Sequence, residues 1–338
     1  MIRAALQKLV YGGALAQEEL EACAREMAEG TASPSQMAAL LTAVSMRGEG
    51  TRELVAFARV LRAYRVAIAP RVESRLIDTC GTGGDGARTL NVSTLAALVA
   101  AGAGAYVAKH GNRSVTSRCG SADLLERLGF NLAASPAAML RAIEEVGIGF
   151  LFAPTYHPAM KHVAQVRREL GFRTLFNLLG PLINPAPVEV QLVGVYSARL
   201  VPIMAEALKE LGVKEAMVVH GLEGLDEISV TGKTLIAWVR EGQVSIREVL
   251  PEELGARRYE ALPAIEGPEH AAEVALALLR GSVGGALREV VLVNSAAALV
   301  LAGRAGGFEE GMQLATRALE QGAALEKLRA LIRYSGPA

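Results

Sequence analysis

The stretch Arg75-Leu-Ile-Asp-Thr-Cys-Gly-Thr-Gly-Gly-Asp-Gly86 decides how the rest of the chain is interpreted. Residues 75–80 predict a strand, and residues 93–103 predict the helix that follows it. Glycines between a strand and a helix let the backbone approach an anion closely, and the first N–H groups of the helix point toward it. The stretch therefore predicts a polyphosphate site at the carboxyl end of a strand.

The same glycines also suit simpler or more familiar turns. They fit an ordinary tight turn in which Ser93 caps the helix, although Ser93 and Thr94 also suit a phosphate or its metal. The sequence has no GxxxxGK[ST] motif, which excludes a P-loop. The spacing of Gly81, Gly83 and Gly86 matches GxGxxG, but no acidic residue stands about 20 positions later to bind a ribose. The dinucleotide fingerprint is therefore incomplete.

A basic stretch follows the second predicted strand, which covers residues 105–108. It reads Lys109-His-Gly-Asn-Arg-Ser-Val-Thr-Ser117 and leads through Gly120-Ser-Ala-Asp123 into a helix. Alone it would be a solvated surface loop. Because the carboxyl ends of parallel strands share one edge of the sheet, we expect it beside the glycine turn, where the two loops would form an anion pocket.

Two later stretches add charged groups of opposite sign. The first, 157–171, predicts a helix that carries the adjacent Arg167 and Arg168, and periodicity does not decide which of them faces inward. The second, His220-Gly-Leu-Glu-Gly-Leu-Asp-Glu-Ile-Ser229, places Asp226 and Glu227 after a predicted strand. Adjacent carboxylates are a candidate Mg²⁺ site, and their simpler interpretation is solvated turn charges.

Apolar periodicity predicts two domains in this 338-residue chain. Residues 1–69 predict about four helices, with Ser33-Pro34 at a helix start and Gly30 and Gly48 at helix ends. Beyond a hinge at Pro70, strands at 188–196 and 215–219 alternate with a helix at 201–211, and 308–334 is helical. This alternation predicts an α/β domain over 70–338 with a mostly parallel central sheet covered by helices.

Charge and cysteine content narrow the class of protein. Lys plus Arg equals Asp plus Glu, at 35 each, whereas a nucleic-acid-binding protein would show a basic excess. The three cysteines form no CxxC pair, so neither a zinc site nor a disulfide framework is predicted. The longest apolar run, 95–108, is shorter than the roughly 20 residues that a membrane span needs. We expect a cytoplasmic protein that binds neither nucleic acid nor membrane.

Taken together and in order, these motifs resemble the anthranilate phosphoribosyltransferase family. The resemblance rests on Gly81-Thr-Gly-Gly-Asp85, Asn91-Val-Ser-Thr94, Lys109-His-Gly-Asn-Arg113, Gly120-Ser-Ala-Asp123, Arg173-Thr-Leu-Phe-Asn177, Gly180-Pro-Leu-Ile-Asn-Pro185 and Asp226-Glu227. It covers almost the whole chain, and only Cys119, where a serine is more usual, departs from it. It implies the fold of the class II nucleoside phosphorylases and a homodimer joined through the helical domains, each completed by helices from about 157–180.

The resemblance also implies an activity and the residues that serve it. The chain would transfer a 5-phosphoribosyl group from phosphoribosyl diphosphate to the amine of anthranilate, with Mg²⁺, in tryptophan biosynthesis. Anthranilate would contact Gly81, Asn112 and Arg167, which favours Arg167 over Arg168, and Ser93, Asp226 and Glu227 would serve the metal. Phosphoribosyl diphosphate would bind Gly81, Gly84, Asp85, Thr89, Asn91, Val92, Ser93, Thr94, Lys109, His110, Gly111, Asn112, Arg113, Ser114, Val115, Thr116, Ser117 and Ser121.

Three other functions fit parts of the sequence. A pyrimidine nucleoside phosphorylase shares the implied fold, but its loop resembles HSTGGVGD, whereas this chain has Asp78-Thr-Cys-Gly-Thr-Gly-Gly-Asp85. A class I phosphoribosyltransferase would place its acidic pair at the end of an apolar strand, yet Gly221-Leu-Glu-Gly-Leu225 precedes Asp226. A catalytically silent sugar-phosphate binder would not need the acidic pair. No single catalytic residue is assigned, although His110 or His157 could accept the released proton.

Overall fold

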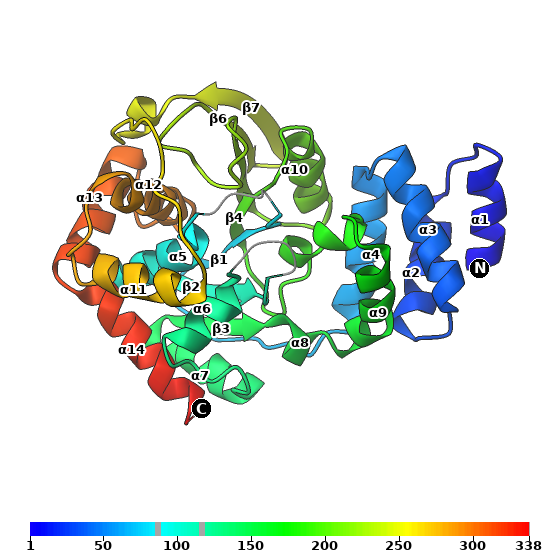
Figure 1. Ribbon diagram of the computed structural model, residues 1–338, viewed down its shortest axis with the longest axis horizontal. Coiled ribbons are helices and arrows are strands. Elements are labelled where there is room, and N and C mark those ends of the chain that lie inside the picture. Colours follow the sequence, from blue (N-terminus) through cyan, green and yellow to red (C-terminus); the bar gives the residue numbers. More distant parts are fainter. Residues whose placement is uncertain (85–88, 115–118, 338) are drawn as a thin grey trace.

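A computed structural model describes residues 1–84, 89–114 and 119–337 of the chain. Its first four helices are α1 (Ile2–Val10), α2 (Gln17–Ala28), α3 (Pro34–Arg47) and α4 (Thr51–Ala63), which lie together at one end of the molecule (Figure 1). The predicted start of α3 is confirmed, because the Ser33 hydroxyl accepts from the Gln36 N–H and the Gln36 side chain accepts from the Ser33 N–H. Gly48 ends α3 at φ 82°, which favours glycine.

A seven-stranded sheet forms the centre of the larger part, in the order β3-β2-β1-β4-β5-β6-β7. Its strands are β1 (Leu76–Gly81), β2 (Tyr106–Gly111), β3 (Ile148–Phe152), β4 (Val190–Gly194), β5 (Glu215–Gly221), β6 (Thr234–Arg240) and β7 (Gln243–Val249). The pairs from β3 to β5 are parallel, whereas β6 and β7 add an antiparallel edge. The predicted mostly parallel α/β sheet is confirmed.

Helices cover both faces of the sheet. One face packs against α5 (Val92–Gly102), α7 (Pro136–Val146), α11 (Pro268–Leu279), α12 (Gly285–Leu301), α13 (Phe308–Glu320) and α14 (Ala323–Ser335). The other face packs against α10 (Leu200–Glu210), which also contacts α4. Strand β5 shows the alternation that this requires, since Met217 and Val219 join the first apolar cluster and Ala216 and Val218 the second.

After β3 the chain returns to the helical end of the molecule (Figure 1). This segment contains α8 (Ala153–Tyr156), η1 (Pro158–Met160), α9 (Lys161–Leu170), η2 (Leu175–Asn177) and η3 (Gly180–Leu182). Helix α9 packs against α2 and α3, and its Val163 and Val166 are buried in the same apolar cluster as α4. The exact division of the chain at residues 69 and 70 stays a prediction.

Two shorter elements complete the fold. Helix α6 (Ser121–Arg127) follows β2, and η4 (Pro251–Leu254) follows β7. Within the described ranges, no helix combines the length and apolar character needed to cross a membrane.

Two boundaries predicted from the sequence are wrong. The helix predicted over 157–171 begins only at Lys161, because His157 lies outside any helix and Pro158–Met160 form η1. Strand β2 does not end at Ala108 but continues through Lys109, His110 and Gly111, which pair with β3. The charged residues at the start of the basic stretch are therefore part of the sheet. Lys109 is 3% exposed and His110 is 6% exposed.

Candidate active site

The site lies at the carboxyl ends of β1 and β4, which are parallel neighbours in the sheet. After β1 the chain continues to β2 on one side of this pair, and after β4 it continues to β5 on the other side. Such a switch of strand order leaves a crevice at the carboxyl ends of the strands. A cavity of about 690 Å³ occupies this position. Asp85, Val115, Thr116 and Ser117 lie outside the described residues. Every other residue that the resemblance implied lines the cavity: Gly81, Gly84, Thr89, Asn91, Val92, Ser93, Thr94, Lys109, His110, Gly111, Asn112, Arg113, Ser114, Ser121, Arg167, Asp226 and Glu227.

The glycine turn after β1 is held by hydrogen bonds from other elements. The Thr82 N–H donates to the Gly194 carbonyl at 2.9 Å, and the Gly83 N–H donates to Asp226 Oδ2 at 2.9 Å. The Gly84 carbonyl accepts from Arg173 Nη1 at 2.5 Å, and the Arg173 guanidinium lies 4.3 Å from the centre of the Tyr196 ring. Arg173 belongs to the motif Arg173-Thr-Leu-Phe-Asn177, but no local pattern predicts this contact with residue 84.

Two paired glycines make room for the acidic pair. Gly81 at the end of β1 and Gly194 at the end of β4 are opposite each other in the sheet. A Cβ on Gly81 would lie 2.6 Å from Asp226 Oδ2, and one on Gly194 would lie 1.5 Å from the Asp226 carbonyl oxygen. Side chains at either position would therefore displace Asp226.

The start of α5 differs from the simplest expectation. The helix begins at Val92 after Asn91, so Ser93 is not its N-cap but lies in the first turn. The Ser93 N–H donates to Glu227 Oε1 at 3.1 Å. Among the described residues, Asn91 Oδ1 and Thr94 Oγ1 are buried without a hydrogen-bond partner. Buried polar atoms usually have partners, so these two oxygens fit a polar ligand in the cavity.

The ammonium group of Lys109 lies between the two loops. Its Nζ donates to the Thr79 carbonyl at 2.5 Å and lies 3.3 Å from Ser93 Oγ. Burial lowers the pKa of Lys109, and the carboxylates of Asp78, Asp226 and Glu227 oppose that shift. The lysine thus places a buried hydrogen-bond donor beside the predicted phosphate site.

A buried polar layer beneath the cavity supports β2. Asp78 accepts from the His110 N–H at 3.1 Å and from Asn184 Nδ2 at 2.8 Å, and Asn184 also donates to the Ala108 carbonyl at 2.9 Å. Burial raises the pKa of Asp78, and Lys109 opposes the shift. Sequence reasoning assigned no role to Asp78 or Asn184, because a buried aspartate in a strand has no local pattern that distinguishes it.

The rings of His110 and His157 are in contact in the lining of the cavity, tilted by 60° to each other. Their ring centres are 5.1 Å apart, and His110 Nδ1 lies 3.0 Å from the Gly180 carbonyl. Burial, together with His110 and Arg65, lowers the pKa of His157 to about 3, and burial also lowers the pKa of His110. Both rings are therefore neutral near pH 7, which makes them weak proton acceptors.

The wall of the cavity that residues 153–183 form is mostly apolar and also contains His157, Lys161 and Arg167. Arg167 on α9 lines the cavity, and its guanidinium lies 5.6 Å from the centre of the Phe176 ring. Burial lowers the pKa of Arg167. Arg168 is exposed and does not line the cavity. The remaining lining of this wall is mostly apolar, from Ala153, Pro154, Pro158, Met160, Ala164, Leu179, Pro181 and Ile183.

The oxygen donors suit a magnesium ion better than a softer metal. Asp226 and Glu227 both line the cavity, and Mg²⁺ is usually held by one or two carboxylates together with water and substrate phosphate. Within the described part of the chain, no group of three His, Cys, Asp or Glu side chains is placed to hold a metal. A metal carried in with a phosphate substrate fits this arrangement.

Two family models match the chain. The model described as "Glycosyl transferase family, a/b domain" matches residues 73–325, and "Glycosyl transferase family, helical bundle domain" matches residues 3–64. A curated relative from Rubrobacter xylanophilus, named anthranilate phosphoribosyltransferase, is 52% identical over 99% of this chain and 98% of its own length.

Solved structures are similar over the same length. The anthranilate phosphoribosyltransferase of Thermus thermophilus has a TM-score of 0.91 at 44% identity, covering 98% of this chain and 99% of its own. The Saccharomyces cerevisiae enzyme in complex with PRPP and Mg has a TM-score of 0.89 at 27% identity, covering 99% and 97%. Another structure of the yeast enzyme, with 4-fluoroanthranilate, has a TM-score of 0.86 at 26% identity with the same coverage.

Proposed function

The chain belongs to the anthranilate phosphoribosyltransferase family, and on that premise we propose that it transfers the 5-phosphoribosyl group from phosphoribosyl diphosphate to the amine of anthranilate. The products are N-(5-phosphoribosyl)anthranilate and pyrophosphate, in a step of tryptophan biosynthesis. One observation carries the proposal. One cavity is lined both by two polar loops with a buried lysine and by a mostly apolar segment that carries Arg167.

The polar wall suits the diphosphate. As the C1–O bond of the ribose breaks, negative charge develops on pyrophosphate, and Lys109 together with backbone N–H groups would stabilise it. Asp226, Glu227 and Ser93 would hold magnesium, which the related yeast structure contains together with PRPP. Bound Mg²⁺ would neutralise further charge on the leaving group. Much of the acceleration would come from positioning the two substrates against each other.

The apolar wall suits the acceptor. Anthranilate is a flat aromatic acid, and the related yeast structure binds its 4-fluoro derivative. We propose that Arg167 pairs with the carboxylate while Gly81 and Asn112 contact the same substrate. The aromatic amine is neutral and has a free lone pair, so the reaction needs no strong base. This agrees with the low pKa of His157.

The proposal extends to assembly and location. We propose a homodimer joined through the helical end of the chain, supported by the large apolar side chains that are exposed there: Met1, Val10, Tyr11 and Met46. We also propose a cytoplasmic location, which fits three scattered cysteines that form no CxxC pair. Sedimentation equilibrium would test the dimer, and a monomer across micromolar concentrations would contradict it.

The activity is tested by the fluorescence of anthranilate. Purified protein mixed with anthranilate, phosphoribosyl diphosphate and Mg²⁺ should consume the fluorescent substrate, and a chelator should stop the loss. Uridine or thymidine with inorganic phosphate provides the competing assay. Faster cleavage of a nucleoside than consumption of anthranilate would favour the pyrimidine nucleoside phosphorylase alternative.

A further inference from the structure

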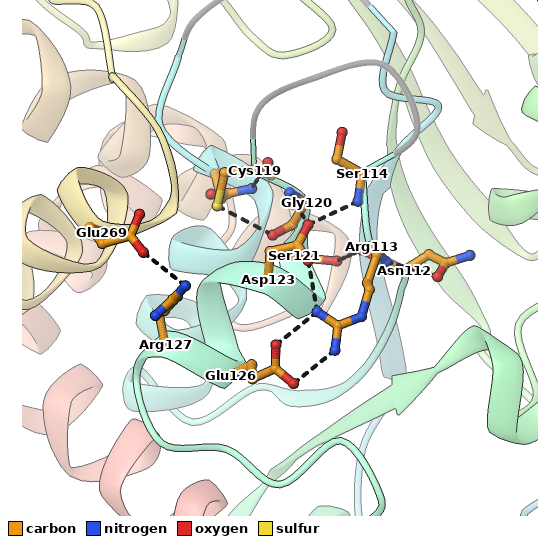
Figure 2. A network of polar contacts seen from close by, with 11 residues as sticks. Asn112, Arg113, Ser114, Cys119, Gly120, Ser121, Asp123, Glu126, Arg127 and Glu269 are labelled. Carbon is orange, nitrogen blue, oxygen red and sulfur yellow. Dashed lines mark hydrogen bonds and ion pairs between the residues drawn. The ribbon is translucent and has the colours of Figure 1, made fainter.

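The loop between β2 and α6 reaches the cavity as two limbs, residues 111–114 and 119–121, which contact each other directly (Figure 2). The Asn112 carbonyl accepts from the Ala122 N–H at 3.2 Å and from Ser121 Oγ at 3.3 Å. A Cβ on Gly120 would lie 2.4 Å from the Ser114 nitrogen. The limbs are therefore so close that glycine is required at position 120.

One carboxylate joins both limbs. Asp123 Oδ2 accepts from the Ser114 N–H at 3.0 Å and from the Gly120 N–H at 2.9 Å, while Oδ1 accepts from Arg113 Nη1 at 2.9 Å. Partial burial acts to raise the pKa of Asp123, but hydrogen bonds from Ser114, Gly120 and Arg113 outweigh it and lower that pKa. Asp123 is therefore ionised at neutral pH and binds donors from both sides of the loop.

Glu126 holds the arginine that Asp123 also contacts. Arg113 Nη1 and Nη2 each lie 2.7 Å from a Glu126 carboxylate oxygen, a bidentate pair in which the guanidinium points toward α6 (Figure 2). Exposed ion pairs contribute little individually, so this contact should matter less than the backbone contacts of Asp123.

We propose that Asp123 is a positioning residue for the phosphoribosyl diphosphate site, and that Glu126 supports it by holding Arg113 on α6. The inference rests on the proposed function. It follows from the placement of Asn112, Ser114 and Ser121, which line the cavity on the two limbs that Asp123 joins. A displacement of about 1 Å in such groups is enough to reduce activity roughly 100-fold.

Asp123→Asn tests the proposal, because asparagine has the same shape but no charge. Its amide oxygen would accept from the Ser114 and Gly120 N–H groups without the aid of a negative charge, and its NH2 group cannot accept from Arg113. The dissociation constant of phosphoribosyl diphosphate with Mg²⁺, measured by calorimetry, should rise about 10- to 100-fold, since each charged hydrogen bond contributes about tenfold or more. The KM for phosphoribosyl diphosphate should rise in parallel, with the anthranilate KM little changed. Glu126→Gln should weaken binding by at most about 5-fold.

Arg127→Gln is the matched control. Arg127 lies on the same helix as Asp123, and the substitution breaks its exposed ion pair with Glu269 on α11, which is 2.8 Å long (Figure 2). Wild-type affinity in this control and weak binding in Asp123→Asn support the proposal. Wild-type affinity in Asp123→Asn, or an equal loss in both variants, overturns it.

Two further outcomes are distinguishable. If Asp123→Asn fails to fold, Asp123→Glu retains the charge with a longer reach, and wild-type affinity in that variant overturns the proposal. If the wild-type chain binds phosphoribosyl diphosphate but does not consume anthranilate, the proposed activity fails while the binding comparison still decides the role of Asp123. A wild-type chain that does not bind phosphoribosyl diphosphate overturns both.

Discussion

The turn after β1 and the loop after β2 line the same cavity, but different parts of the chain hold them. The turn is held from a distance, because Gly83 donates to Asp226, 143 residues later, and Gly84 accepts from Arg173, 89 residues later. The loop is held locally, because Asp123 accepts from backbone groups nine and three residues earlier. The turn therefore requires several elements in place at once, whereas the described limbs of the loop are held mainly by α6, with one longer-range contact from Asn91 Nδ2 to the Cys119 carbonyl at 3.0 Å.

The acidic pair Asp226 and Glu227 also helps to hold the turn after β1 and the start of α5. Asp226 holds the Gly83 N–H and Glu227 holds the Ser93 N–H, so the proposed metal ligands also fix the turn and the start of α5. Magnesium bound by these carboxylates would therefore couple to the geometry of the turn. The contacts of Asp123 give the second loop an anchor of its own on α6.

The largest effect is expected from the double substitution Asp226→Ala and Glu227→Ala. It removes the proposed metal ligands and the anchors of the turn together, so turnover should fall by about 100-fold or more. The magnesium concentration for half-maximal rate should rise as well. Initial rates over a magnesium titration measure both. Replacing the exposed pair Glu309 and Glu310 on α13 by Ala is the matched control. An unchanged titration in the first variant would identify Asp226 and Glu227 as solvated turn charges.

Substitution of Arg167, which belongs to neither loop, should weaken only the binding of the acceptor anthranilate. Arg167→Ala removes a charged partner for the anthranilate carboxylate, which costs about 1.5–3 kcal/mol, or roughly 10- to 150-fold in affinity. The anthranilate KM should rise by that factor while phosphoribosyl diphosphate binding stays near wild type. Arg168→Ala, on the exposed side of α9, is the control. Equal effects from both arginines would show that Arg167 does not have the proposed role.

The features of the fold and the site that depend on neighbouring residues could be predicted from the sequence, and those that depend on distant contacts could not. Local signals were sufficient for the capped start of α3 and for the parallel β/α order, because each depends on neighbouring residues. The motifs also predicted which residues meet in the cavity. The extension of β2 was missed, since the polar residues Lys109 and His110 become buried only through Asp78, Thr79 and Asn184. Contacts over such separations leave no local pattern.

His157, in the segment after β3, is buried against His110 of β2, and this burial predicts a pH dependence of stability. The pKa of His157 falls from an ordinary 6.5 to about 3 in the folded chain, so unfolding takes up a proton below pH 6.5 and stability decreases as pH falls. This histidine alone should cost about 2 kcal/mol between pH 7 and pH 5. Urea unfolding of wild type and His157→Gln at both pH values measures the difference. An equal pH-dependent loss in the two proteins would contradict the shift.

The smallest effect is expected from Arg173, which forms a hydrogen bond with the glycine turn although it lies 89 residues away in the sequence. Arg173→Ala removes the hydrogen bond to the Gly84 carbonyl and the stacking on Tyr196. Because Arg173 is exposed, these contacts together should change the KM for phosphoribosyl diphosphate by only roughly 3- to 10-fold. Arg173→Lys keeps the charge and should recover part of the loss. The control Arg199→Ala breaks an arginine–carboxylate pair with Glu49, 3.3 Å long, without touching the turn. If Arg199→Ala raised the KM as much as Arg173→Ala, the effect would come from the general packing of the helical end, and the turn would not depend on Arg173.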